Sequence, residues 1–192
     1  KKIDYKMLSF KVFPEREIPS VFWYQREFRY SLTYQKGEAP LIFVIAGTGS
    51  SFYSANMIFF QRIFYQAGFH VICLPSPTHM NFITTASATG LPGNIIADAA
   101  DLYRVMTMVW EQVEDRIKVS EFYLTGYSLG ASEAAFVAKL DEEKRTFNFK
   151  KVLMINPAVS LYSSAKILDQ MLLAALPCGL KDFNAWLDRI LG

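Results

Sequence analysis

A serine lies at the centre of a short glycine-bounded segment, Gly126–Gly130, which reads Gly-Tyr-Ser-Leu-Gly. The apolar residues before it predict a strand, and the alanine-rich residues after it predict a helix. A chain that turns abruptly from strand to helix strains the residue at the turn and exposes its side chain. We therefore expect the Ser128 hydroxyl to stand at the carboxyl end of a sheet, as a nucleophile for acyl transfer. The alternative interpretation is a plain helix N-cap.

A second glycine-rich turn, Ala46–Gly49, directly follows an apolar strand. Acyl transfer through serine needs two N–H donors aimed at the developing oxyanion. One comes from the residue after the nucleophile, here Leu129, and for the other we assign Thr48, with Gly49 as the substitute. The alternative is a connection with no catalytic role. The expected pocket around these donors comprises Gly47, Gly49, Tyr127 and His79, with Phe52 and Tyr53 as candidates for an apolar acyl pocket.

The chain has two histidines, and both precede the serine. His70 begins an apolar strand, which favours a structural role. His79 lies in the long loop 75–93, at the expected carboxyl edge of the sheet where ligands bind. It is a candidate pocket residue and a candidate base, although an exposed loop histidine is the simpler interpretation. Neither histidine belongs to a Cys/His cluster, so we expect no metal and no cofactor.

The elements that must position these residues alternate along the chain. Strands are expected over 5–13, 26–35, 41–45, 69–74, 122–125 and 151–155, and helices over 54–67, 95–113 and 129–140. Segment 26–35 alternates polar and apolar residues, as a half-buried antiparallel strand does, whereas the later strands are apolar on both faces. We predict an α/β fold: a mostly parallel sheet with an antiparallel N-terminal hairpin and helices on both faces.

Two further helices are expected at 161–176 and 182–191. With them, residues 161–192 form a helical extension to a core of residues 1–160, as the start of a lid over the site or as a dimer contact. The acidic side chains are expected on solvated surfaces, namely Asp98 and Asp101 on helix 95–113 and the charged run 141–145.

The composition excludes several classes of protein. A chain of 192 residues that is 52% hydrophobic and 15% aromatic is expected to form a packed core. The net charge of +2 is scattered, which argues against a nucleic-acid partner. No apolar stretch reaches the ~20 residues that span a bilayer. The two cysteines, Cys73 and Cys178, favour the cytoplasm over an oxidising compartment, while the start at Lys1 is also compatible with a removed signal peptide.

The two turns and the order of elements resemble the α/β-hydrolase superfamily over about residues 5–157. The resemblance implies hydrolysis of an ester, thioester or related acyl bond of a small-molecule substrate through an acyl-enzyme on Ser128. In that family the acid and the histidine follow the serine, and here neither they nor the last strands of the fold are visible. Three hypotheses stay open: a truncated serine hydrolase, a hydrolase-fold binding module without turnover, and an enzyme that uses His79 as its base. The oligomeric state is left open.

Overall fold

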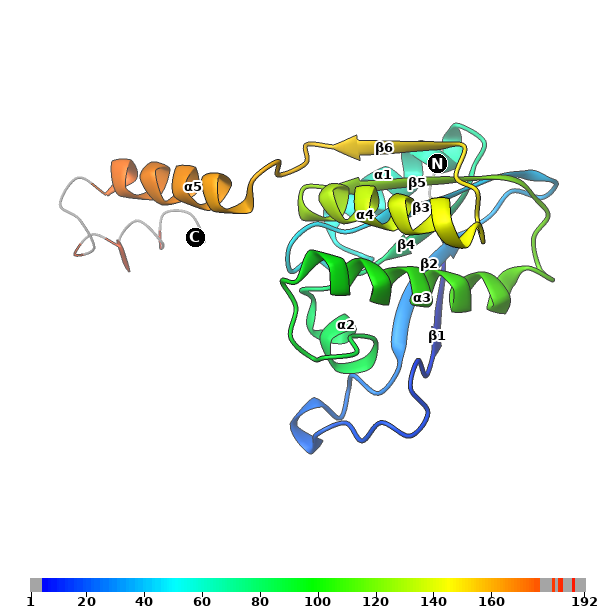
Figure 1. The fold of residues 1–192 in the computed structure, drawn as a ribbon, viewed down its shortest axis with the longest axis horizontal. Helices are drawn as coiled ribbons and strands as arrows, with labels where there is room; N and C mark the ends of the chain where they lie inside the picture. The colour runs from blue at the N-terminus through cyan, green and yellow to red at the C-terminus, as the bar shows by residue number, and fades with distance from the viewer. Residues whose placement is uncertain (1–4, 177–180, 182, 185–187, 189–192) are drawn as a thin grey trace. The chain divides into compact units, whose positions relative to one another are not determined.

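The structure is a computed structural model that describes residues 5–176, 181, 183–184 and 188. Six strands form one sheet in the order β1-β2-β4-β3-β5-β6 (Figure 1). Their bounds are β1 Lys6–Phe10, β2 Phe28–Thr33, β3 Ala39–Ile45, β4 His70–Leu74, β5 Val119–Tyr127 and β6 Lys151–Ile155. Strand β2 pairs antiparallel with β1 and β4, whereas β3 pairs in parallel with β4 and β5, and β5 with β6. The predicted sheet, mostly parallel with an antiparallel N-terminal hairpin, is confirmed.

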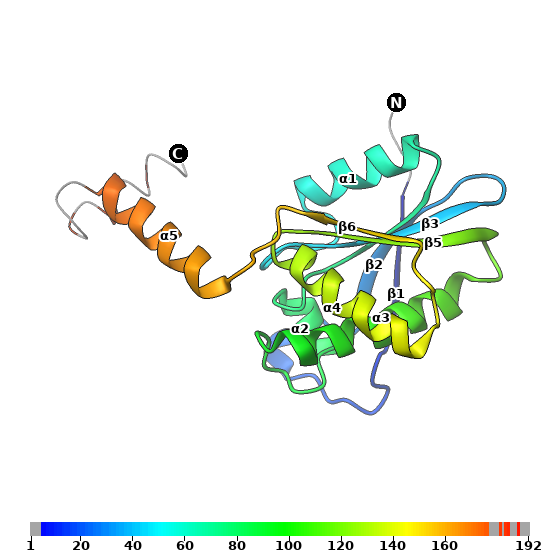
Figure 2. The ribbon, with the colours of Figure 1, turned by 45° about the horizontal axis from the view of Figure 1, so that its top comes forward.

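Within residues 5–157, helices cover both faces of this sheet (Figure 2). They are α1 Ala55–Gln66, α2 Met80–Thr85, α3 Ile95–Val113 and α4 Leu129–Lys144, with a short 3-10 helix at Ser20–Phe22. A further helix, α5 Leu161–Ala175, lies later in the chain. Alternate residues of β3 enter different cores: Phe43 and Ile45 pack with α3 and α4, and Ile42 and Val44 pack with α1. This two-sided burial explains why the central strands are apolar without alternation.

Helix α1 follows its predicted limits, because Ser54 precedes its first residue and Gly68, at φ 95°, follows its end. Met57 is buried on the inner face of the helix, with Phe60 and Phe64 packed against the same core. Gln61 is buried and donates from Nε2 to the Ser31 hydroxyl at 3.0 Å, while Ile63 is 41% exposed. Ser31 is therefore covered by α1, and the prediction that strand 26–35 is only half-buried was wrong at this position.

The segment 75–93 was expected to be a loop, but it contains the short helix α2. Asn94 caps α3 as predicted, with Oδ1 accepting from the N–H groups of Ile96 and Ala97. The expectation of a solvated acidic face on α3 was wrong. Asp98 and Asp101 are each 3% exposed, because both carboxylates accept hydrogen bonds from the loop between α2 and α3.

Strand β6 was expected to be buried, and this too was wrong. It forms the edge of the sheet beyond β5, and its residues are exposed or half-buried, with Leu153 at 52% and Met154 at 48%. Asp141, predicted on a charged surface, is 3% exposed. It accepts hydrogen bonds from the Tyr103 hydroxyl and from the N–H groups of Phe147 and Phe149, and so ties the end of α4 to the segment before β6.

The chain divides into two compact units, residues 1–157 and 158–192. In the second unit, α5 begins after Ser160, whose hydroxyl accepts from the Ser163 N–H at 3.2 Å. The helix expected at 182–191 and Cys178 fall largely or wholly outside the described residues, and the lid remains a prediction. Among the residues that the structure describes, no helix has the length and apolar character to cross a membrane.

Candidate active site

Ser128 is the residue between β5 and α4, and its backbone is strained. Its φ is 55° and its ψ is −120°, a region that residues with a side chain rarely adopt. Ser128 occupies the N-cap position of α4, but its side chain makes no capping hydrogen bond. Its N–H instead donates to the Ile155 carbonyl oxygen of β6 at 3.0 Å. Ser128 is half-buried as a residue, and its hydroxyl is not engaged as the plain N-cap interpretation requires.

The two glycines that flank the serine are required by contacts between backbones. A Cβ added to Gly126 would lie 2.0 Å from the carbonyl oxygen of Gly130. A Cβ added to Gly130 would lie 2.4 Å from the carbonyl oxygen of Ile45 and 2.5 Å from that of Ala46. The strand, the turn and the first helical turn thus fold tightly on one another and against the end of β3.

The turn Ala46–Gly49 lies directly beside Ser128. A Cβ added to Gly47 would be 3.1 Å from the Tyr127 carbonyl oxygen and 3.3 Å from the Ser128 Cβ. Gly47 is buried and Tyr127 is half-buried, with its ring 5.9 Å from that of Phe60 in α1. Because β3 and β5 are adjacent and parallel, their carboxyl ends bring these two turns together at one edge of the sheet.

The amides at this edge differ in their hydrogen bonding. Within the described part of the chain, neither the Thr48 N–H nor the Leu129 N–H donates a hydrogen bond. The Gly49 N–H, in contrast, donates to the Thr78 hydroxyl at 2.7 Å. Thr48 and Leu129 therefore keep free donors, as an oxyanion site needs, whereas Gly49, the substitute expected from the sequence, is already bonded.

His70 is structural. Its Nδ1 accepts from the Gln35 N–H and its Nε2 lies 3.0 Å from the Lys118 carbonyl oxygen, which together define a neutral ring that donates from Nε2. Burial lowers its pKa, although the bond to the Lys118 carbonyl opposes the shift. His70 begins β4, so it lies at the amino edge of the sheet, opposite the edge that holds Ser128.

His79 lies at the same edge as Ser128 but in a capping role. It precedes α2, and its Nδ1 accepts from the Asn81 N–H at 3.2 Å. A neutral imidazole with an accepting Nδ1 carries its proton on Nε2, so it has no second lone pair with which to act as a base. Burial lowers its pKa. Among the described residues, no hydrogen bond joins His79 to Ser128. The roles of His79 at the pocket and as a base stay predictions.

Glu133 was not singled out from the sequence. It lies in the second turn of α4, is 1% exposed, and neither of its carboxylate oxygens has a hydrogen-bond partner among the described residues. Burial, together with the nearby charge of Asp98, raises its pKa to about 9, so the side chain is neutral near pH 7. A glutamate within the alanine-rich start of this helix was the only signal in the sequence.

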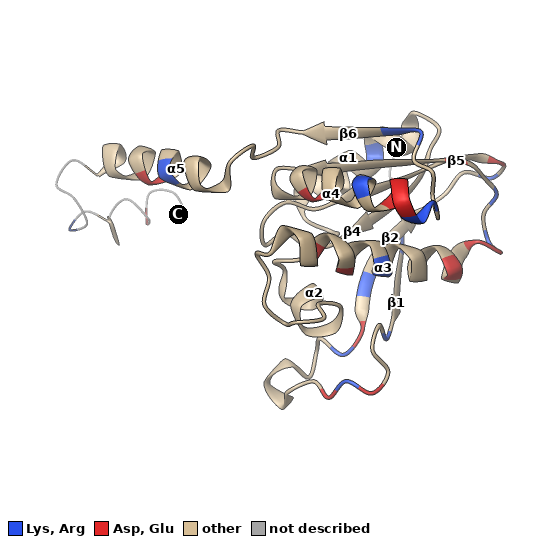
Figure 3. Ribbon diagram, in the orientation of Figure 1, with Lys and Arg blue, Asp and Glu red and all other residues tan. Residues whose placement is uncertain are grey.

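Charges are few where Ser128 lies. In α4 the Lys, Asp and Glu residues other than Glu133 lie in the C-terminal half, and small residues prevail at the start of the helix (Figure 3). Buried Gly130, Ala131 and Ala134 let this half approach the sheet and α3 closely. Within the described ranges, no group of three or more His, Cys, Asp or Glu side chains could hold a metal ion.

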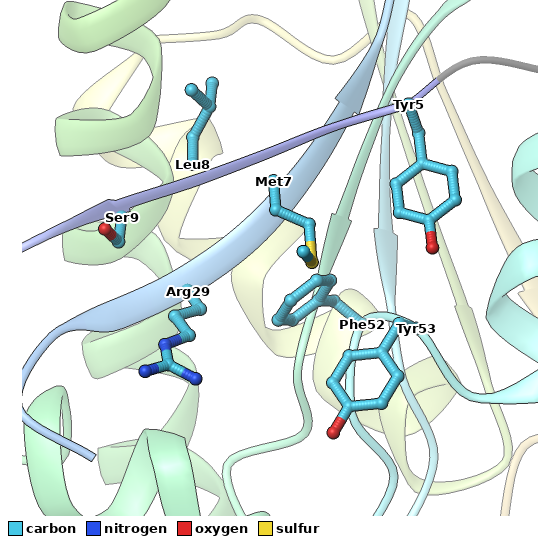
Figure 4. Close-up of a pocket in the computed structure, with 7 residues that line it drawn as sticks. All are labelled: Tyr5, Met7, Leu8, Ser9, Arg29, Phe52 and Tyr53. Atoms are coloured by element: carbon cyan, nitrogen blue, oxygen red, sulfur yellow. The ribbon is translucent and has the colours of Figure 1, made fainter. Parts of the chain in front are cut away.

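Phe52 and Tyr53 line a different hollow from the one expected. An open pocket of about 460 Å³ lies beside β1 and β2, where Met7, Arg29 and the two aromatic side chains face one another (Figure 4). Phe52 is 3% exposed and Tyr53 is 55% exposed. Ser128, Thr48 and Leu129 are not among the lining residues, so this pocket gives no support to an acyl-binding role for the two aromatics.

Solved carboxylesterases have a similar fold. EstE1, a thermophilic carboxylesterase cloned from a metagenomic library, gives a TM-score of 0.58 at 18% identity over 83% of this chain and 49% of its own. A thermostable carboxyl esterase from Bacillus coagulans gives 0.55 at 18% identity over 91% of this chain and 51% of its own. Est1E from Butyrivibrio proteoclasticus gives 0.53 at 13% identity over 73% and 51%. Comparisons with protein-family models and with curated proteins gave no match.

The chain therefore has an α/β-hydrolase fold, and it spans about half the length of the solved structures that it matches. At these identities the likeness defines the fold. One fold can carry many different chemistries, which depend on the residues of the site.

Proposed function

We propose that this chain carries the nucleophile and the oxyanion site of a serine hydrolase that cleaves an ester, thioester or related acyl bond of a small molecule. The observation that carries the proposal is the backbone of Ser128 at φ 55° and ψ −120°. Strain of this kind persists only where the surroundings enforce it, and it clusters at catalytic residues. The esterase neighbours support the same class of reaction.

In the proposed reaction the Ser128 Oγ attacks the carbonyl carbon while its proton passes to a general base. The carbonyl oxygen becomes an oxyanion that accepts from the Leu129 and Thr48 N–H groups, aided by the positive end of the α4 dipole. Collapse of the intermediate expels the alcohol or thiol, which takes the proton, and leaves an acyl-serine. Water then repeats the sequence and releases the acid.

The proposed reaction also needs a general base that accepts the proton of the Ser128 hydroxyl. Of the two histidines, His70 lies at the opposite edge of the sheet and His79 accepts at Nδ1. We propose that the base and its acid come from sequence beyond these 192 residues, in keeping with matched structures about twice as long. A second candidate function is a binding module without turnover. It is favoured by the finding that, within the described residues, no histidine contacts Ser128.

Labelling with a fluorophosphonate separates the two candidates, because this reagent reacts only with an activated serine. We expect the full-length protein to label and to hydrolyse p-nitrophenyl esters, and Ser128→Ala to abolish both. Ser120→Ala is the matched control, since Ser120 is exposed near the amino end of the same strand. Absence of labelling in folded full-length protein would support the binding module, and labelling that survives Ser128→Ala would exclude Ser128 as the nucleophile.

A further inference from the structure

The turn that carries the Thr48 amide is held from one side by the loop that follows β4. The Ala46 N–H donates to the Leu74 carbonyl oxygen at 3.1 Å, which extends the pairing of β3 with β4. The Ser50 N–H closes the turn onto the Gly47 carbonyl oxygen at 3.0 Å. These bonds fix the two ends of the turn but make no contact with the N–H groups at its tip.

The tip itself is held by a side chain. The Gly49 N–H donates to the Thr78 Oγ1 at 2.7 Å, across 29 residues of sequence. Gly49 has a φ of 66°, which glycine adopts without a steric cost. Thr48 and Gly49 are both exposed, so packing does not hold the tip of the turn in place of this hydrogen bond.

The accepting hydroxyl is in turn fixed by Ser76. The Ser76 Oγ lies 2.9 Å from the Thr78 Oγ1 and also accepts from the Thr78 N–H at 3.3 Å. Ser76 is fully buried, and its N–H donates to the Ser50 carbonyl oxygen at 3.0 Å. The loop after β4 therefore contacts the turn at two points, and a buried anchor holds the hydroxyl that meets the tip.

We infer that Thr78 is a positioning residue for the oxyanion site: by binding the Gly49 N–H, it fixes the Thr48–Gly49 peptide at the tip of the turn and leaves the neighbouring Thr48 N–H unbonded. The close approach of Gly47 to the Ser128 Cβ places this turn beside the serine. The Thr78 hydroxyl thus occupies the Gly49 amide and holds the conformation in which the Thr48 amide can act as a donor. This inference rests on the proposed function, because Thr48 matters only if an oxyanion forms at Ser128.

The test compares three substitutions in the full-length protein with p-nitrophenyl esters as substrates. Thr78→Val keeps the shape but removes the acceptor, and we expect kcat to fall about 10- to 100-fold with KM within about twofold, since an oxyanion donor acts mainly in the transition state. Thr78→Ser keeps the hydroxyl and should retain kcat within about threefold. Thr84→Val is the matched control, because the Thr84 hydroxyl bonds to carbonyl oxygens of its own helix.

A second readout does not depend on turnover. In Thr78→Val the Gly49 amide should exchange with deuterium faster than in the wild type, and in Thr78→Ser it should stay protected. Thr78→Ala removes the same acceptor, and it replaces the valine variant if that variant does not fold. Ser128-dependent hydrolysis with an unchanged kcat in Thr78→Val would overturn the positioning role alone. A folded wild type without Ser128-dependent hydrolysis would overturn the proposed function and this inference with it.

Discussion

The backbone of Gly130 packs directly against the Ile45 carbonyl oxygen, so that a Cβ on Gly130 would lie 2.4 Å from that atom. The first turn of α4 is thereby pressed onto the end of β3. Because Ile45 immediately precedes the turn Ala46–Gly49, this contact also sets the distance between Ser128 and that turn, which carry the proposed nucleophile and the proposed second oxyanion donor. The spacing of the two turns therefore depends on residue 130 being a glycine, which has no side chain to separate them.

Gly130→Ala should consequently destabilise the fold by about 3 kcal/mol or more, because the obstructing atoms belong to the backbone and cannot rotate away. The free energy of unfolding in urea measures the effect. Gly37→Ala is the control, since a Cβ at Gly37 meets no atom within 4 Å. Equal stability of the two variants would mean that α4 and β3 can separate without cost.

Ser128→Gly should stabilise the protein while it abolishes the proposed hydrolysis. Glycine adopts a φ of 55° without the steric cost that a side chain imposes, so relief of strain should add about 1 kcal/mol even after the greater freedom of glycine in the unfolded chain is counted. Ser128→Ala keeps the Cβ and serves as the reference. Thermal melts of the two variants check the prediction, and a glycine variant that melts no higher than the alanine variant would contradict it.

Glu133 should make stability fall as the pH rises. Its pKa is about 9 in the folded chain against a usual value of 4.5, so between these values the folded state holds a proton that the unfolded state has lost. The stabilisation is complete below the unfolded pKa, and it declines by about 1.4 kcal/mol per pH unit until the folded pKa is reached.

Glu133→Gln removes this titration, and its urea unfolding free energy should be nearly flat from pH 5 to pH 8 relative to that of the wild type. Glu143→Gln, at an exposed position of the same helix, is the matched control and should keep the wild-type slope. Parallel pH profiles for the wild type and Glu133→Gln would show that the Glu133 carboxyl is ionised in the folded protein.

The sequence predicted the elements that carry the candidate site because their signals are local. Strand 41–45 is apolar on both faces, and the glycines around Ser128 mark a turn that only glycine permits. The antiparallel direction of the N-terminal hairpin and the parallel direction of the later strands followed from the same patterns. Thus the fold and the proximity of the two turns could be anticipated without coordinates.

What could not be anticipated depends on contacts that no periodicity in the sequence indicates. Asp98 and Asp101 looked solvated, because the N–H groups of Gly93 and Ala88 that they accept from belong to a loop whose path no periodicity reveals. The contact between Gly49 and Thr78 has the same origin. Strand β6 looked buried because an apolar strand does not indicate whether it lies inside a sheet or at its edge.

Asp141 joins the end of α4 to the segment that leads into β6. Its carboxylate accepts from the Tyr103 hydroxyl at 2.7 Å and from the N–H groups of Phe147 and Phe149 at 2.9 and 3.2 Å. Asp141→Ala leaves three buried or half-buried donors without an acceptor and should cost about 3 kcal/mol of unfolding free energy.

Its neighbour Glu142 is exposed and pairs with Lys139 at the surface, so Glu142→Ala should cost less than about 1 kcal/mol. Asp141→Asn, which keeps one accepting oxygen, should fall between the two. Urea unfolding of the three variants measures this order. If Asp141→Ala were as stable as Glu142→Ala, the carboxylate would not be what holds the end of α4 to β6, and the start of α4 would be tied to β6 by the bond from the Ser128 N–H to the Ile155 carbonyl oxygen.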